Sequence, residues 1–301
     1  MRRVEEMVER VWPGRSAQIE VLGGGITNRN FKITVHGESF VLRIGGKDTE
    51  LLGIDREAEY EASCVAAQLG IGPEVVRFLE PEGYLVTRFV GGVPVPPEEL
   101  RRPERLRQLA RALKRVHDGP PIGSRFDSFR VVERYHATAL AHGVAIPAAY
   151  VGAKELADAI ERAREPQRPS TCHNDLLNAN LIATDGRIVI VDWEYAGMGD
   201  RFFDLANFSV NHELSEEQNA ELLQAYAGHL HTEDEDALRL MRYMSDFREA
   251  MWGVVQQGIS ELDFDFAGYA GDHFDRLERT AAETGFRAAL AGAERAPEGR
   301  P

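Results

Sequence analysis

Two hydrophobic periods follow one another in the first ninety residues. Residues 19–46, IEVLGGGITNRNFKITVHGESFVLRIGG, alternate apolar and polar positions over two or three short runs, which predicts an antiparallel hairpin or meander. From residue 55 to 69 the period becomes helical, with apolar side chains at 58, 62, 65, 66 and 69. Residues 4–12 predict a short amphipathic helix, and residues 75–90, VVRFLEPEGYLVTRFV, predict two further strands around a turn.

Residues 91–97, GGVPVPP, form the strongest break in this pattern, because clusters of glycine and proline mark loops. Beyond the break we predict one long helix over 98–117, two more over 130–142 and 151–164, and further helices over 202–294. Two short apolar runs, NLIAT and RIVIVDW, predict a small hairpin of strands within this helical part. The prediction is therefore an α+β fold with an N-terminal lobe over residues 1–90 and a C-terminal helical lobe over residues 91–301.

Composition narrows the class of protein. The 301 residues carry a formal net charge of -14 and no basic cluster outside the predicted helix 98–117, so we expect no nucleic-acid partner. An acidic surface is compatible with a cationic substrate. Two cysteines, Cys64 and Cys172, lie far apart in sequence, which fits a reducing compartment. No apolar signal core and no run near the ~20 residues of a membrane span is present, so we expect a cytoplasmic protein without stable membrane insertion.

Residues 172–197, CHNDLLNANLIATDGRIVIVDWEYAG, contain the densest polar chemistry of the chain. If NLIAT and RIVIVDW pair as a hairpin, Asn180 at the start of one strand lies beside Asp192 at the end of the other. An amide oxygen and a carboxylate there can share Mg²⁺, and Asp175 on the preceding loop can accept a proton from a hydroxyl. His173 is predicted to brace this loop through hydrogen bonds to the backbone. Taken singly, each residue is also compatible with a turn or strand-end role.

The N-terminal part offers groups for a phosphoryl donor. Residues 22–31, LGGGITNRNF, join two predicted strands, and their glycines would let backbone N–H groups approach phosphates. A plain tight turn explains the glycines equally well, and no Walker P-loop follows. Arg43 stands in mid-strand, where a cation needs a partner, and Glu57 in the following helix is the predicted partner. The alternative is a surface cation beside a solvated glutamate.

These parts together follow the logic of a kinase: a glycine-rich loop, a strand cation paired with a helix acid, a hinge, an Asp–Asn loop and a metal-binding Asp. The sequence lacks the His-Arg-Asp and Asp-Phe-Gly motifs of protein kinases, and it has no Ala-Pro-Glu motif with an activation segment before it. We therefore predict a small-molecule kinase that uses ATP and Mg²⁺.

At this point the chain resembles the choline/ethanolamine kinases, within the broader aminoglycoside phosphotransferase-like group. It is especially similar to the bacterial choline kinases linked to lipopolysaccharide phosphocholine. The matching stretches run from about residue 22 to 270 and include GGGITNRNFKI, FVLRIGGKDTELLGIDREAE, LGIGPEVV, CHNDLLNANLI, VDWEYAGMGDRFFDLANF and MWGVVQQGISELDFDFAGYA. The resemblance implies a protein-kinase-like two-lobed fold, with a small antiparallel sheet in the N-lobe.

The resemblance also implies roles for particular residues. Asp175 is the expected catalytic base, assisted by His173, and Asn180, Asp192 and Glu194 are the expected metal site. Arg43 takes the place of the usual kinase lysine. The expected nucleotide-binding residues are Arg43, Glu57, Gly24, Gly25, Thr27, Asn28, Thr87 and Phe89, with the segment from Thr87 to Phe89 offering backbone groups to adenine.

The acceptor is expected to be a small amino alcohol, choline or ethanolamine first. In the family the ammonium group sits among aromatic rings and carboxylates, and Trp252, Tyr195, Tyr269 and Asn211 are the expected substrate-binding positions, with Phe266 a further candidate. Asn211 stands where related enzymes often have a glutamate, and Val255 where some have a second tryptophan; Glu213 is a candidate to compensate. Other hydroxylated amines (thiamine, an aminoglycoside, an amino sugar) and a nucleotide-binding pseudo-kinase remain as alternatives, and the oligomeric state stays open.

Overall fold

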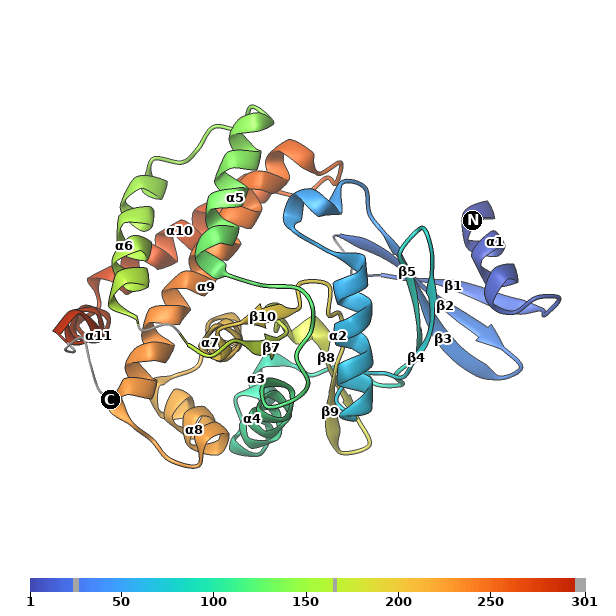
Figure 1. The fold of residues 1–301 in the computed structure, drawn as a ribbon, viewed down its shortest axis with the longest axis horizontal. Helices are drawn as coiled ribbons and strands as arrows, with labels where there is room; N and C mark the ends of the chain where they lie inside the picture. The colour runs from blue at the N-terminus through green and yellow to red at the C-terminus, as the bar shows by residue number, and fades with distance from the viewer. Residues whose placement is uncertain (24–26, 165–166, 296–301) are drawn as a thin grey trace.

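A five-stranded antiparallel sheet forms one end of the molecule, and helices form the rest (Figure 1). The computed structural model describes residues 1–23, 27–164 and 167–295. The strand order is β1-β2-β3-β5-β4, with bounds β1 Ala17–Leu22, β2 Asn28–Val35, β3 Glu38–Gly45, β4 Val75–Leu79 and β5 Tyr84–Arg88. In β3, Phe40, Leu42 and Ile44 are buried, and Arg43 points to the opposite face because successive side chains alternate along a strand.

Two helices accompany this sheet and belong to different cores. Helix α1 (Arg2–Val11) buries Val4, Met7 and Val8 in a small core with the strands. Helix α2 (Arg56–Gln68) begins at Asp55, whose side chain accepts the N–H groups of Glu57 and Ala58. Its apolar face packs into the large core of the helical part instead of the small one. Helix α2 therefore ties the sheet to the helical part, and the boundary near residue 90 stays a prediction.

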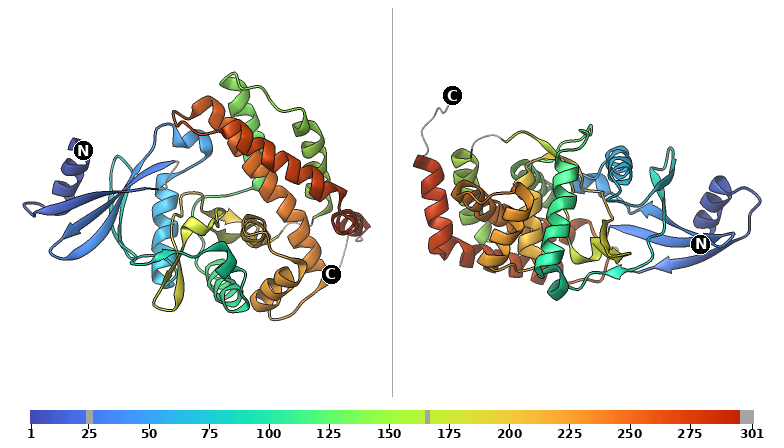
Figure 2. Two further views of the ribbon diagram at one scale, coloured as in Figure 1. Left: turned by 180° about the vertical axis from the view of Figure 1, so that it is seen from behind. Right: turned by 90° about the horizontal axis from the view of Figure 1, so that it is seen from below.

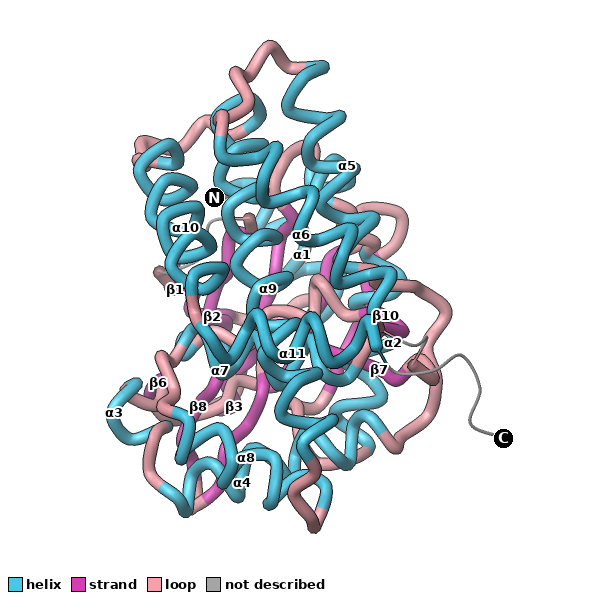
Figure 3. The backbone as a smooth tube through the Cα atoms, turned by 90° about the vertical axis from the view of Figure 1, so that its left-hand side faces the viewer, coloured by secondary structure: helices cyan, strands magenta, loops and turns pink. Residues whose placement is uncertain are grey.

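The helical part surrounds α9, a helix of 28 residues. It packs against α5, α7 and α10, and α10 runs beside it when the molecule is seen from behind (Figure 2). The helices are α3 Pro97–Leu100, α4 Pro103–His117, α5 Ser128–Ala141, α6 Ala149–Ala163, α7 Arg201–Asn211, α8 Glu216–Ala227, α9 Thr232–Ile259, α10 Phe266–Ala282 and α11 Thr284–Arg295. Figure 3 views the molecule from this helical end, which is the left-hand side of Figure 1.

The single helix predicted over 98–117 is wrong. The segment forms two helices, because Pro103 starts α4 and a proline ring is tolerated in the first turn of a helix but not in its interior.

Short strands and turns position the polar loop between α6 and α7. The predicted hairpin is confirmed: β8 (Leu181–Thr184) pairs antiparallel with β9 (Arg187–Ile190). The other short elements are β6 Val93–Pro94, β7 Ser170–Cys172, β10 Gly197–Gly199 and the 3₁₀ turns η1 Thr49–Leu52 and η2 Asn178–Asn180. Within the described residues, no helix is both long and apolar enough to cross a bilayer.

Candidate active site

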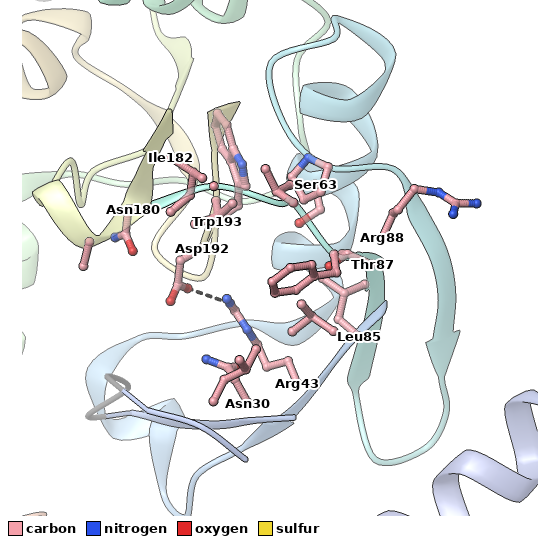
Figure 4. Close-up of a pocket in the computed structure, with 18 of the residues that line it drawn as sticks. Asn30, Arg43, Ser63, Leu85, Thr87, Arg88, Asn180, Ile182, Asp192 and Trp193 are labelled. Atoms are coloured by element: carbon pink, nitrogen blue, oxygen red, sulfur yellow. Dashed lines mark hydrogen bonds and ion pairs between the residues drawn. The ribbon is translucent and has the colours of Figure 1, made fainter. Parts of the chain in front are cut away.

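A cleft of about 420 Å³ separates the sheet from the β8–β9 hairpin (Figure 4). Five residues singled out from the sequence line it, namely Arg43, Thr87, Phe89, Asn180 and Asp192. Arg43 and Asp192 point toward each other in Figure 4, and Arg43 Nη1 lies 2.6 Å from Asp192 Oδ1. The cleft thus brings together residues from both predicted lobes.

Asp175 lies on the loop that leads from β7 to the hairpin. Asn180 Nδ2 donates to the backbone oxygen of Asp175 at 2.9 Å and to its Oδ2 at 3.2 Å. His173 braces the loop as predicted, because its Nδ1 accepts the N–H of Asp175 at 3.2 Å and its Nε2 lies 3.0 Å from Val191 O. The ring is fully buried, and burial lowers the pKa of His173. His173 therefore positions the loop that carries Asp175, and its lowered pKa favours the neutral ring.

Side chains of helix α7 accept hydrogen bonds from the backbone of the same loop. Asp204 accepts the N–H groups of His173 at 2.8 Å and Asn174 at 2.6 Å, and Asn207 Oδ1 accepts the N–H of Leu176 at 2.6 Å. Burial alone would raise the pKa of Asp204, but the hydrogen bond and positive field of His117 and the backbone N–H of His173 lower it below its usual range. A charged carboxylate thus fixes the backbone on which Asp175 stands.

The hairpin places Asn180 and Asp192 side by side. The N–H of Val191 donates to the backbone oxygen of Asn180 at 2.9 Å, and Asp192 has a φ of 66°, an uncommon left-handed conformation for a non-glycine residue. Because the amide nitrogen of Asn180 donates to Asp175, its oxygen is left as the ligand atom, and a carboxylate with an amide oxygen is a donor set that suits Mg²⁺. The residues present therefore fit the predicted metal.

The predicted pair of Arg43 with Glu57 is wrong. Arg43 Nη1 binds Glu59 Oε1 at 2.6 Å, and Glu59 is buried whereas Glu57 is exposed at the first turn of α2. The helical period explains the difference. Glu59 lies three and seven residues before the buried Ala62 and Ala66, so it shares their face, and Glu57 does not.

A second arginine, missed from the sequence, links the two parts of the molecule. Arg56 Nη1 lies 2.7 Å from Glu59 Oε2 and 3.3 Å from Glu194 Oε2. We call Arg43, Arg56, Glu59, Asp192 and Glu194 the donor-side cluster. It joins β3 and α2 to the segment after β9, so its ion pairs also hold the lobes together.

Two residues expected at the nucleotide contact the donor-side cluster. Thr27 Oγ1 donates to Glu194 Oε1 at 2.5 Å, and Asn28 Nδ2 donates to Glu194 Oε2 at 2.8 Å. Glu194 is thus occupied by donors from the sheet in this structure. Gly24 and Gly25 lie outside the described residues.

The hinge segment lines the cleft, but two of its backbone N–H groups are already used. The N–H of Arg88 donates to Glu74 O at 2.8 Å, and the N–H of Phe89 donates to Ser39 O at 3.0 Å. An adenine would therefore need another backbone group of residues 87–90, all of which line the cleft.

The two central carboxyl groups share an unusual electrostatic environment. Burial, the largest cause, raises the pKa of Asp175 to about 8, with the field of Arg248 opposing and Glu249 adding to it. Burial also raises the pKa of Glu194 to about 7, followed by the field of Asp192. Perturbed carboxyl groups of this kind are typical of functional sites.

A second group of residues gathers on the other side of Asp175. Trp252 Nε1 donates to Tyr195 Oη at 3.1 Å, and Tyr269 Oη donates to Glu249 Oε2 at 2.8 Å. Arg248 pairs with Glu249, and its Nη1 lies 3.6 Å from Asp175 Oδ1. We call Tyr195, Arg248, Glu249, Trp252 and Tyr269 the acceptor-side cluster. Three of its members were expected from the sequence, and Arg248 and Glu249 were not.

Of the remaining residues expected at the acceptor, one borders the acceptor-side cluster and the others are not shown to contact it. The ring of Phe266 lies 5.8 Å from that of Trp252, so it borders the cluster. No hydrogen bond of the described residues joins Asn211 to the cluster, and its buried Nδ2 has no partner among them. Glu213 is exposed and pairs with Arg101 at 3.2 Å, which gives no support to a compensating role. Val255 is fully buried.

The fold and this site define a phosphotransferase. Residues 18–241, well over half of the chain, match the family described as the phosphotransferase enzyme family, and the chain belongs to that family. Its architecture is the two-lobed kinase-like fold. A solved structure of a choline/ethanolamine kinase family protein from Mesorhizobium loti has a TM-score of 0.82 and 29% identity, covering 98% of this chain and 99% of that one.

Two curated relatives extend the comparison. Protein LicA of Haemophilus influenzae is 27% identical over 259 residues, with 81% of this chain and 75% of LicA covered. Ethanolamine kinase 2 of Homo sapiens is 26% identical over 299 residues, with 88% of this chain and 76% of that protein covered.

Proposed function

We propose that this protein transfers the γ-phosphate of ATP, with Mg²⁺, to the hydroxyl group of a small amino alcohol of the choline or ethanolamine kind. The observation that carries the proposal is the convergence of three residues: Asn180 and Asp192 line the cleft, and Asn180 Nδ2 donates to Asp175 directly behind them. Each comes from a different part of the loop and hairpin, and together they supply a base and a metal site. The names of the relatives support the choice of amino alcohols.

The chain's own residues divide the reaction between them. Asp175 aligns the acceptor hydroxyl and takes its proton as the oxygen bonds to the γ-phosphorus and the bond to the ADP oxygen breaks. Asn180 and Asp192 would hold the metal, with Glu194 the third expected member of its site, and Arg43 would meet the donor phosphates from β3. Bound Mg²⁺ would neutralise charge on the β- and γ-phosphates.

The acceptor-side cluster supplies the recognition of a cationic amine. The rings of Trp252, Tyr195 and Tyr269 offer faces to an ammonium group, and Glu249 offers a carboxylate. Because Asn211 and Val255 replace a glutamate and a tryptophan that related enzymes use, we expect choline to be turned over measurably but bound weakly.

An ADP-release assay with choline, ethanolamine, thiamine and an aminoglycoside tests this proposal. We expect acceptor-dependent, Mg²⁺-dependent ADP formation with choline or ethanolamine, above a blank without acceptor. Turnover of another alcohol alone would overturn the choice of acceptor and leave the phosphotransferase intact. ADP release that never depends on an added alcohol would contradict the proposed reaction.

A further inference from the structure

Arg248 is a buried cation next to the proposed base. Its side chain is 2% exposed, and one nitrogen, Nη1, serves both Glu249 and the contact of 3.6 Å to Asp175 Oδ1. The face of its guanidinium is also occupied, with Cζ 4.4 Å from the centre of the Tyr195 ring. The other two nitrogens, Nε and Nη2, are buried and have no hydrogen-bond partner in the described part of the chain.

Unpaired donors of this kind need a partner. Leaving a buried N–H group of a charged side chain unsatisfied costs more than a hydrogen bond contributes, so such groups are rare. Nε and Nη2 share one edge of the planar guanidinium, and that edge can bind both oxygens of a carboxylate at once. The free edge of Arg248 therefore has the chemistry of an anion site.

The position of Arg248 places it on the acceptor side of the site. Arg248 stands on α9 among Tyr195 and Trp252, on the acceptor side of Asp175, and it does not line the cleft in which Arg43 and Asp192 lie. An acceptor must place its hydroxyl at Asp175 to react, so its neighbouring groups come within reach of Arg248.

We propose that Arg248 binds a carboxylate of the acceptor, so that the preferred substrate is an amino alcohol that also carries a carboxylate, a hydroxy-amino acid. This inference rests on the proposed function and narrows its substrate class. The other groups agree with a zwitterion: Glu249 and the aromatic rings suit the ammonium group, and Arg248 suits the carboxylate. Choline and ethanolamine leave the free edge unpaired.

Matched acceptors test the proposal. L-serine is ethanolamine with a carboxylate on the carbon that bears the amine, and L-homoserine stands in the same relation to 3-aminopropan-1-ol. We expect kcat/KM of the intact protein to favour the carboxylated member of at least one pair by about tenfold or more, because a site with buried donors discriminates against a ligand that lacks the acceptor.

Variants assign the effect to the guanidinium. In Arg248→Gln the preference should fall by about tenfold or more, mainly through KM of the carboxylated acceptor. The double variant Arg248→Gln/Glu249→Gln removes both charges of the pair and serves where the single variant fails to fold. Arg239→Gln, nine residues earlier on α9 and paired with Glu216, is the control and should keep the preference. If both Arg248 variants unfold, the comparison of acceptors in the intact protein decides alone.

Three results overturn the inference. If ethanolamine and 3-aminopropan-1-ol match or exceed their carboxylated partners in both pairs, the acceptor class is wrong while the proposed function stands. An equal loss of kcat for both members of a pair in Arg248→Gln would assign Arg248 to the base or the transferred phosphoryl group. A preference that survives in Arg248→Gln would assign the carboxylate to another residue. Absence of turnover with all four acceptors and with choline would overturn the proposed function as well.

Discussion

The donor-side and acceptor-side clusters use the same residue types to different ends. Each contains arginine in contact with a buried glutamate. On the donor side, Arg43 and Arg56 meet Glu59, Asp192 and Glu194, and neither arginine has a buried nitrogen without a partner among the described residues. On the acceptor side, Arg248 meets Glu249 but keeps two buried nitrogens unpaired.

This difference in the pairing of the arginine nitrogens indicates different roles for the two clusters. The donor-side cluster connects the sheet and α2 with the segment after β9, so its ion pairs hold the molecule together as well as meeting the donor. The acceptor-side cluster lies within the helical part and next to one carboxylate, Asp175. Changes in the first should affect stability and ATP together, whereas changes in the second should affect the acceptor.

The largest expected effect comes from Asp175, which lies between the clusters. Asp175→Asn should lower kcat by about 10²–10⁴-fold, because the amide cannot accept the proton of the hydroxyl. ATP binding and the thermal unfolding midpoint should remain close to those of the unmodified protein. Steady-state rates with the best acceptor measure the effect, and an unchanged kcat would remove Asp175 from the role of base.

The second largest effect is expected on the donor side, from Asp192→Ala. The variant loses the only charged member of the Asn180–Asp192 pair, so productive Mg²⁺–ATP binding should be abolished. Isothermal titration with ATP, with and without Mg²⁺, measures this. Mg²⁺-dependent ATP affinity equal to that of the unmodified protein would show that the metal is held elsewhere.

Glu59 and Glu57 give a matched pair within one helix. Glu59→Gln weakens the contacts to Arg43 and Arg56, so we expect a loss of about 1–3 kcal/mol in the free energy of unfolding and a raised KM for ATP. Glu57→Gln, at an exposed position, should stay within about 0.5 kcal/mol. Urea unfolding of both proteins decides, and equal effects would contradict the pairing seen in the structure.

Trp252→Ala tests the role of the acceptor-side cluster. Removing the ring and its hydrogen bond to Tyr195 should raise KM for choline about tenfold, with a smaller change in KM for ATP. Tyr60→Ala, which removes an exposed ring on α2, is the control. A rise confined to KM for ATP would place Trp252 outside the acceptor site.

The smallest effect is expected at Asn211. Asn211→Glu adds negative charge at the position where relatives often carry a glutamate, and an added charge near an ammonium group is worth ~1 kcal/mol, about fivefold in kcat/KM. Cationic alcohols should gain and an uncharged alcohol should not. Equal changes for both kinds of alcohol would show that position 211 does not face the acceptor's charge.

Much of the fold and the centre of the site could be predicted because they depend on local order. Alternation in β2 and β3 and the period of α2 follow from residue spacing. The adjacency of Asn180 and Asp192 follows from a short hairpin, which only needs neighbouring segments to pair. Pro103 also predicts a break in the helix, since a proline disrupts a helix interior. The prediction of one helix over 98–117 did not take it into account.

Partners distant in sequence depended on the tertiary structure. Arg43 could be assigned a carboxylate from its place in a strand, but the choice of Glu59 over Glu57 followed from which face of α2 packs against the larger core. Arg248 lies in a helix whose many apolar residues predict a buried core element, and no local sequence feature indicates that two of its nitrogens lack partners. It becomes a candidate binding group only because the fold brings α9 to Asp175, 73 residues earlier in the chain. The sequence by itself determined the elements and the catalytic hairpin, because backbone pairing and hydrophobic period act over short distances. The packing of α2 and α9 decided which buried charges are neutralised and which remain to meet a substrate, because the cost of burying a charge depends on everything that surrounds it in space.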